Sequence, residues 1–69
     1  MTEGKRKIIT KIARQIFSKY GFIKTTVDDI AKAARIGKAS IYHYFKSKED
    51  LFENVVEQEY QLLIEKVIN

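Results

Sequence analysis

The sequence has no cysteine, no proline and no tryptophan, and only three glycines among its 69 residues. Without cysteine, the chain can form neither a disulfide framework nor a thiolate zinc site. The shortage of proline and glycine, together with plentiful Ala, Ile, Lys and Glu, favours helix over a sheet-rich or disordered chain. We therefore expect a small helical protein whose stability depends on its hydrophobic core.

Long apolar runs are also missing. No segment approaches the ~20 consecutive apolar residues that a membrane span requires, and no signal peptide follows Met1. We therefore expect a soluble, cytoplasmic protein that makes no membrane contact. The length allows one domain, which would bury only about 60% of the surface that its unfolded chain exposes, so marginal stability is expected.

Positive charge is concentrated toward the N-terminus. Residues 1–24 hold seven Lys or Arg against one Glu, residues 25–48 hold five against two Asp, and residues 49–69 hold one against six acidic residues. The segment charges of +6, +3 and −5 make up the net charge of +4. One end of the chain suits a polyanion and the other repels it. This polarity alone is equally compatible with nucleic-acid binding and with a solvated basic face.

Apolar spacing predicts two helices in the first half of the chain. The first spans about residues 4–20 and ends at Gly21, after which Phe22 would touch Phe17. Its apolar stripe is Ile9, Ile12, Ala13, Ile16, Phe17 and Tyr20. Thr25 or Thr26 would cap a second, short helix that ends near Ala34, with Asp28 and Asp29 in its first turn.

Two more helices are predicted after a break at residues 35–37, where Ile36 would fill the angle. The third covers residues 38–45, with Ile41 and Phe45 facing inward. Ser47 followed by Asp50 resembles a capping box, and the fourth helix runs from there to about residue 68. Its main apolar stripe would be Phe52, Val55, Val56, Tyr60, Leu63 and Val67.

The second and third helices match the spacing of a helix-turn-helix. The matching positions are Val27, Ile30, Ala31, Ala34, Ile36, Ile41 and Tyr44. Two helices that cross steeply need a small residue at their close approach, which Ala31 supplies, and a turn of three or four residues. The second helix of such a pair can enter a DNA major groove about 12 Å wide. The expected fold class is all-α, a three-helix, homeodomain-like helix-turn-helix domain followed by a longer fourth helix.

The segments TTVDDIAKAA, IYHYF and KSKEDLF resemble the tetracycline-repressor (TetR) family of bacterial transcription regulators, over about residues 8–55. The resemblance implies a DNA-binding domain at residues 1–47, with the helix-turn-helix at about 27–46. Residues 48–69 would link to a ligand-binding, dimerising domain that this sequence does not contain. The implied function is sequence-specific binding of double-stranded DNA by a ligand-responsive repressor. Its implied partners are a palindromic operator, a second copy of the full-length protein, and a small-molecule effector bound by the absent domain.

The resemblance also assigns contacts by position. Base and phosphate contacts fall on Lys38, Ala39, Ser40, Tyr42 and His43, and further phosphate contacts fall on Thr26 and Lys48. Tyr44 would either pack inward or touch the DNA backbone. Helix starts present free amides to phosphate, which agrees with the assignment of Thr26 and Lys48.

Three positions depart from the family's pattern. Arg35 stands in the turn where the family commonly has glycine, so a left-handed residue there would be strained. Gly37 replaces the usual serine or threonine cap of the third helix. Ala39 replaces a common glycine, which brings a methyl group close to the floor of the groove.

Several residues also allow other interpretations. His43 is the only histidine, and no carboxylates are placed to complete a metal site with it. No nucleophile with a base, and no glycine-rich phosphate loop, indicates an enzyme, and no cofactor is expected. Lys5, Arg6 and Lys7 suit either a basic arm or the solvated start of the first helix. Arg35 would either reach a phosphate or remain free.

The last helix carries apolar residues on too many sides for a helix that packs only on three short ones. Leu62, Leu63 and Ile64 are consecutive and are followed by Val67 and Ile68. We expect these residues to pack against a missing domain, or else to mediate self-association. The alternative function is therefore a helical protein-interaction or self-association module that uses this helix.

Overall fold

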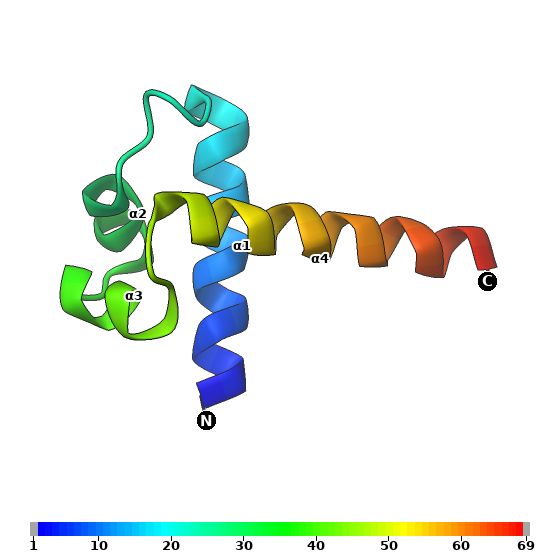
Figure 1. Ribbon diagram of the computed structural model, residues 1–69, viewed down its shortest axis with the longest axis horizontal. Helices are drawn as coiled ribbons and strands as arrows, with labels where there is room; N and C mark the ends of the chain where they lie inside the picture. The colour runs from blue at the N-terminus through cyan, green and yellow to red at the C-terminus, as the bar shows by residue number, and fades with distance from the viewer. Residues whose placement is uncertain (1, 69) are drawn as a thin grey trace.

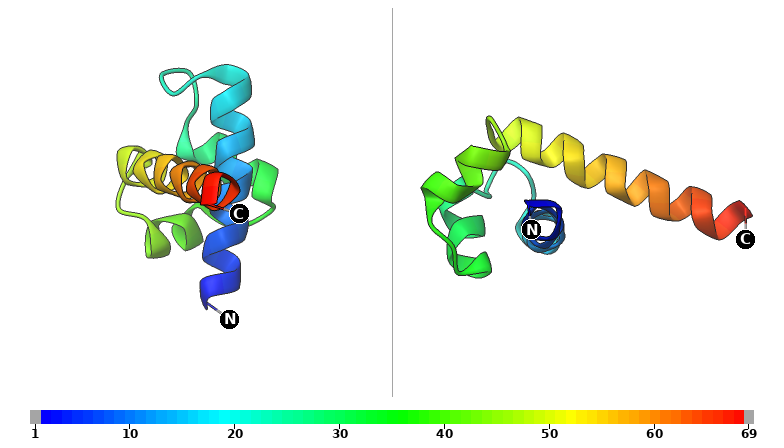
Figure 2. Two further views of the ribbon diagram at one scale, coloured as in Figure 1. Left: turned by 90° about the vertical axis from the view of Figure 1, so that its right-hand side faces the viewer. Right: turned by 90° about the horizontal axis from the view of Figure 1, so that it is seen from below.

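The computed structural model describes residues 2–68 and contains four helices. They are α1 (Thr2–Tyr20), α2 (Val27–Ala34), α3 (Lys38–Tyr44) and α4 (Lys48–Ile68). The short pair α2 and α3 lies at one end of the molecule beside α1, while the C-terminal part of α4 extends away from that pair (Figures 1 and 2). The all-α prediction is confirmed. No helix within residues 2–68 combines the length and apolarity needed to cross a membrane.

One hydrophobic core draws residues from all four helices. Its fully or nearly fully buried members are Ile9, Ala13, Phe17, Val27, Ile30, Ala31, Ile41, Phe45, Leu51 and Val55. Ala31 is 5% exposed, as expected for the small residue at a close helix approach. Ile36, in the α2–α3 turn, is partly buried and packs against this core, as its sequence position predicted. The core therefore fixes α3 on α1, α2 and the first turns of α4.

Gly21 ends α1 as predicted. Its φ of 88° lies in the left-handed region, and its amide donates to the Phe17 carbonyl at 2.8 Å. The Phe17 and Phe22 ring centroids are then 5.7 Å apart, and Phe52 of α4 lies 5.2 and 4.9 Å from them. This aromatic cluster joins the end of α1 to α4. Lys5, Arg6 and Lys7 belong to the solvated first turns of α1 rather than to a separate arm.

The start of α4 is capped by Ser47, whose Oγ accepts from the Asp50 amide at 3.1 Å. The Asp50 carboxylate accepts from the Lys46 amide at 2.9 Å, one residue earlier than in a standard capping box. The predicted signature therefore marks the helix start correctly. The reciprocal bond reaches one residue further back along the chain.

The predicted apolar stripe of α4 packs against the core only as far as Val55. Leu51, which the prediction omitted, is fully buried, whereas Val56, Tyr60, Leu63 and Val67 are 51%, 62%, 60% and 78% exposed. Tyr20, assigned to the stripe of α1, is also 54% exposed. The reason is geometric, because the second half of α4 projects beyond the other helices (Figure 2). Ile68, which belonged to the same expectation, lies outside the residues whose side chains are described.

Candidate nucleic-acid interface

Thr26 and Asp29 form a complete capping box at the start of α2. The Thr26 hydroxyl accepts from the Asp29 amide at 3.1 Å, and the Asp29 carboxylate accepts from the Thr26 amide at 3.0 Å. Thr25 is instead buried, and its hydroxyl donates to the Gly21 carbonyl at 2.7 Å. The N-cap is therefore Thr26, and its two hydrogen bonds with Asp29 fix the backbone at this exposed helix start.

The capping box changes the acidity of Asp29. The hydrogen bond from the Thr26 backbone amide, and then the contact with its hydroxyl, lower the pKa of the Asp29 carboxyl below its ordinary value of 3.8. Lys32 adds a smaller effect in the same direction. Sequence reasoning treated Asp29 only as a first-turn charge. The spacing of Thr26 and Asp29, three residues apart, was the signal that it missed.

The turn between α2 and α3 depends on a left-handed residue at Arg35. Its φ and ψ are 59° and 41°, and its amide donates to the Lys32 carbonyl at 3.2 Å. The next amide, that of Ile36, returns to the Ala31 carbonyl at 3.1 Å. A non-glycine residue in this conformation costs roughly 1 kcal/mol relative to glycine. The predicted strain at Arg35 is therefore present.

Helix α3 is anchored by Ile41 and Phe45, each 1% exposed. Gly37 is its N-cap and makes no side-chain cap bond, because glycine has no side chain. Lys38, Ala39, Tyr42 and His43 are exposed, whereas Ser40 and Tyr44 are partly buried. The predicted reading residues therefore share one short helix whose opposite side is fixed in the core.

Two aromatic side chains at the end of α3 differ in their surroundings. The rings of His43 and Tyr44 meet edge to face with centroids 5.1 Å apart. Tyr44 packs partly against the core, whereas His43 is exposed. For Tyr44, inward packing is thus observed, and contact with a DNA backbone stays a prediction. Within residues 2–68, no three His, Asp or Glu side chains come together as a metal site would require.

Lys38 lies beside an acid of the preceding helix. Its Nζ is 3.5 Å from Oδ1 of Asp28, and both side chains are more than half exposed. This pair joins the first turn of α3 to the first turn of α2, a contact that sequence reasoning missed because the two residues are ten positions apart. An exposed pair of this kind contributes little stability, so Lys38 can leave Asp28 for another anionic partner at little cost.

Lys48 contacts the segment between α1 and α2. Its Nζ donates to the Phe22 carbonyl at 2.8 Å and lies 4.2 Å from the Phe22 ring centroid. Thr26 follows four residues after Phe22, so this bond ties the start of α4 to the chain that leads into α2. The structure thereby links the two helix starts that sequence reasoning assigned to phosphate. Their contacts with DNA stay predictions.

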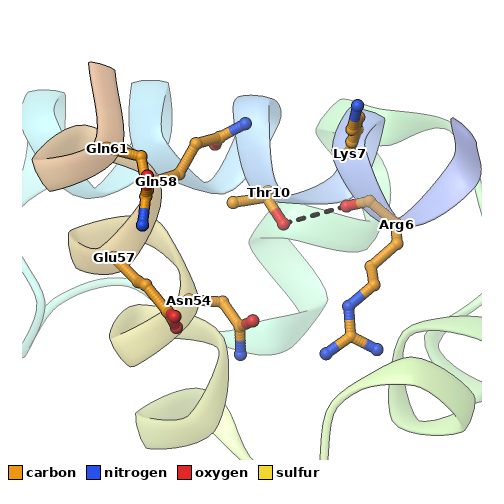
Figure 3. A pocket seen from close by; sticks show the side chains of 7 residues that line it. All are labelled: Arg6, Lys7, Thr10, Asn54, Glu57, Gln58 and Gln61. Carbon is orange, nitrogen blue, oxygen red and sulfur yellow. Dashed lines mark hydrogen bonds between the residues drawn. The ribbon is translucent and has the colours of Figure 1, made fainter. Parts of the chain in front are cut away.

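A separate open pocket of about 410 Å³ lies in the angle between α1 and α4 (Figure 3). Its lining residues are Arg6, Lys7, Thr10, Asn54, Glu57, Gln58 and Gln61. The Thr10 hydroxyl donates to the Arg6 carbonyl, which keeps this part of α1 internally bonded. Arg6 also lies with its guanidinium carbon 5.0 Å from the Phe45 ring centroid. None of the lining residues comes from α2 or α3, so the pocket is distinct from the surface of α3.

Comparison with known proteins finds a family whose model matches most of the chain. Residues 9–55 match the model of the family described as bacterial regulatory proteins, tetR family. The matched segment begins in α1 and ends at Val55, the last core residue of α4. It therefore covers the whole helix-turn-helix and the part of α4 that packs against it.

Two curated relatives are named as regulators. The chain is 40% identical over 55 residues to the uncharacterised HTH-type transcriptional regulator YhgD of Bacillus subtilis, covering 80% of this chain and 29% of that protein. It is 48% identical over 52 residues to IcaR of Staphylococcus aureus, the HTH-type negative transcriptional regulator of the biofilm operon icaADBC, covering 75% of this chain and 27% of that protein. The matched part of the chain thus spans less than a third of the length of either relative.

Proposed function

The chain belongs to the tetR family of bacterial regulatory proteins, and on that premise we propose that it binds double-stranded DNA sequence-specifically as part of a transcriptional repressor. One observation carries the proposal. Helix α3 is fixed on the core by Ile41 and Phe45, while Lys38, Ala39, Tyr42 and His43 remain exposed on it. The negative regulation named for the Staphylococcus aureus relative supports the choice of a repressor.

In the proposed complex, α3 lies in the major groove and α2 crosses the DNA backbone. Lys38, Ser40 and His43 read base edges, with Lys38 donating to guanine acceptors, and the Ala39 methyl meets a thymine methyl. Thr26, Tyr42 and Lys48 contact phosphates and set the register, and Tyr44 touches the backbone at the edge of the groove. The exposed N-terminus of α2 supports the phosphate assignment there, because amides at a helix start point toward an anion.

The larger protein is proposed to act as a homodimer on a palindromic operator, because two copies of a helix-turn-helix read two half-sites. Residues 1–47 would form its DNA-binding domain. Residues 48–69 would continue into a domain that dimerises and binds a small-molecule effector, which the greater length of the relatives supports. A repressor of this kind works on DNA in the bacterial cytoplasm.

A salt titration of binding to a random-sequence duplex tests DNA binding itself. A protein that neutralises phosphates releases counterions, so log K should fall linearly with log[salt], by about 0.9 per phosphate neutralised. Fluorescence anisotropy of a labelled duplex gives this slope. Binding that is absent at low salt, or that does not respond to salt, would contradict the proposal.

The exposed half of α4 favours a second candidate, a helical interaction or self-association module. Val56, Tyr60, Leu63 and Val67 are each at least half exposed and recur at spacings of four, three and four residues. Such spacing places them along one side of the helix. Sedimentation equilibrium of wild type and a Leu63→Glu variant tests this surface. A module of this kind would associate without DNA and would lose that association in the variant.

A further inference from the structure

Arg35 holds a backbone conformation that glycine would adopt without penalty. It is the only non-glycine residue with positive φ within residues 2–68. The turn requires this conformation because the Arg35 and Ile36 amides close α2 on the Lys32 and Ala31 carbonyls. Ile36 must then turn inward onto the core. The turn therefore needs the left-handed backbone at this position, but that backbone does not require an arginine side chain.

The Arg35 side chain makes no contribution to the folded domain that the described residues reveal. It is exposed, and it forms no hydrogen bond, ion pair or cation–π contact with any residue described here. The other two arginines differ. Arg6 lies over the Phe45 ring, and Arg14 pairs with Glu59 at 2.8 Å. A strained position that retains a large charged side chain without an internal partner points to an external one.

The position of Arg35 relative to α3 follows from the short turn between α2 and α3. Asp28 and Lys32 are four residues apart on one face of α2, and Arg35 is the C-cap residue that follows this helix, three residues before Lys38. Asp28 on this face lies 3.5 Å from Nζ of Lys38 in α3. The face therefore borders the exposed start of α3. Lys32 follows Asp28 on this face, and Arg35 follows in the turn that leads to Lys38.

We propose that Arg35 binds a phosphate of duplex DNA beside the groove that α3 enters. This inference rests on the proposed DNA-binding function and adds a contact that the sequence left open. A guanidinium presents paired N–H donors that match two phosphate oxygens, which an ammonium cannot do. Such a contact fixes the register of the protein on DNA and does not select a sequence.

The test compares Arg35→Gly with two other variants of the whole chain. Arg35→Lys keeps a positive charge at the turn, and Lys66→Gln removes one positive charge from the far end of α4. Binding of each to one random-sequence duplex is followed by anisotropy over a salt series, and thermal unfolding is followed by circular dichroism. Lys66→Gln controls for the loss of net charge, since both neutral variants lower it equally.

Arg35→Gly should unfold at the wild-type temperature or a few degrees higher, because glycine relieves the left-handed backbone. It should also bind every duplex more weakly, with a salt slope lower by about one unit. Arg35→Lys should keep most of the slope, and Lys66→Gln should keep all of it.

Three outcomes would overturn the assignment. If wild type shows no salt-dependent binding, the proposed function fails and Arg35 has no DNA to contact. If wild type binds but Arg35→Gly and Lys66→Gln behave alike, only the Arg35 contact is wrong. If Arg35→Gly unfolds at a clearly lower temperature, the side chain supports the fold and the premise of the inference is wrong.

Discussion

The ammonium of Lys48 donates a 2.8 Å hydrogen bond to the backbone carbonyl of Phe22, 26 residues earlier in the chain. The same ammonium lies over the Phe22 ring, 4.2 Å from its centroid. This bond connects the first residue of α4 to the segment that leads into the capped start of α2. An ammonium has three N–H donors, so two remain for an external acceptor such as a phosphate.

Lys48→Ala should therefore affect stability and DNA binding together. Loss of the Phe22 bond is expected to cost about 1 kcal/mol, which lowers Tm by about 4–8 °C in a domain of this size. Loss of the charge is expected to lower the salt slope of duplex binding by about one unit, for all sequences alike. Thermal unfolding and anisotropy measure the two effects.

Lys48→Arg is the matched control, because it keeps the charge and changes the donor geometry. It should retain the salt slope of wild type even if Tm falls. If Lys48→Ala shows a lower Tm with an unchanged slope, Lys48 is a structural residue only, and its assignment to phosphate is wrong.

The capping box makes the Thr26 hydroxyl a contributor to the stability of the domain. Thr26→Ala removes the hydroxyl that accepts from Asp29 and should cost about 1 kcal/mol. Thr26→Ser keeps that oxygen and should restore most of the stability and the DNA affinity. Urea unfolding of the three proteins measures the first effect. Equal stability of the alanine and serine variants would show that the cap contributes nothing.

Asp29 gives the fold a specific dependence on pH. Because the Thr26 hydrogen bonds lower the pKa of Asp29 in the folded state, the ionised carboxylate stabilises the fold above its ordinary pKa of 3.8. This contribution is lost as the pH falls through the lowered, folded-state pKa. Asp29→Asn keeps an oxygen acceptor but cannot ionise, so wild type should be the more stable protein at neutral pH. Urea unfolding from neutral pH to below 3.8 should show the difference shrinking; a difference that does not change with pH would contradict this account.

Local sequence signals predicted much of the fold because their physical causes are local. Gly21, Thr26 and Ser47 each mark a helix boundary through a bond within a few residues of themselves. The inward positions of α3 followed from a spacing of four between Ile41 and Phe45. Strain at Arg35 was expected only through the resemblance to a family that commonly has glycine at this turn position, and its φ is 59°.

The features that sequence did not predict depend on distant parts of the chain. Periodicity shows which residues of α4 share a face, but not where the other helices stop covering it. Tyr60 belongs to the predicted apolar stripe but is exposed, because the other helices do not reach it (Figure 2). The bond between Lys48 and Phe22 and the pairing of Lys38 with Asp28 likewise require the folded arrangement of the helices.

The boundary between the packed and projecting parts of α4 can be tested by replacing a leucine with alanine on each side of it. Leu51 is fully buried, whereas Leu62 in the same helix is 49% exposed. Leu51→Ala should cost about 2–5 kcal/mol, enough to unfold much of a small domain at ambient temperature. Leu62→Ala should change stability by less than about 1 kcal/mol. Comparable losses in the two variants, measured by urea unfolding, would mean that the core extends along α4.

The central claim is that side chains of α3 read a DNA sequence. Selection of bound duplexes from a randomised pool, followed by sequencing, tests it directly for wild type, Lys38→Ala, Ser40→Ala and Lys48→Ala. We predict one enriched sequence for wild type, a changed preference for the Lys38 and Ser40 variants at roughly 1–3 kcal/mol per lost base contact, and the wild-type preference for Lys48→Ala. No enrichment, or the same enriched sequence for all four proteins, would contradict the claim.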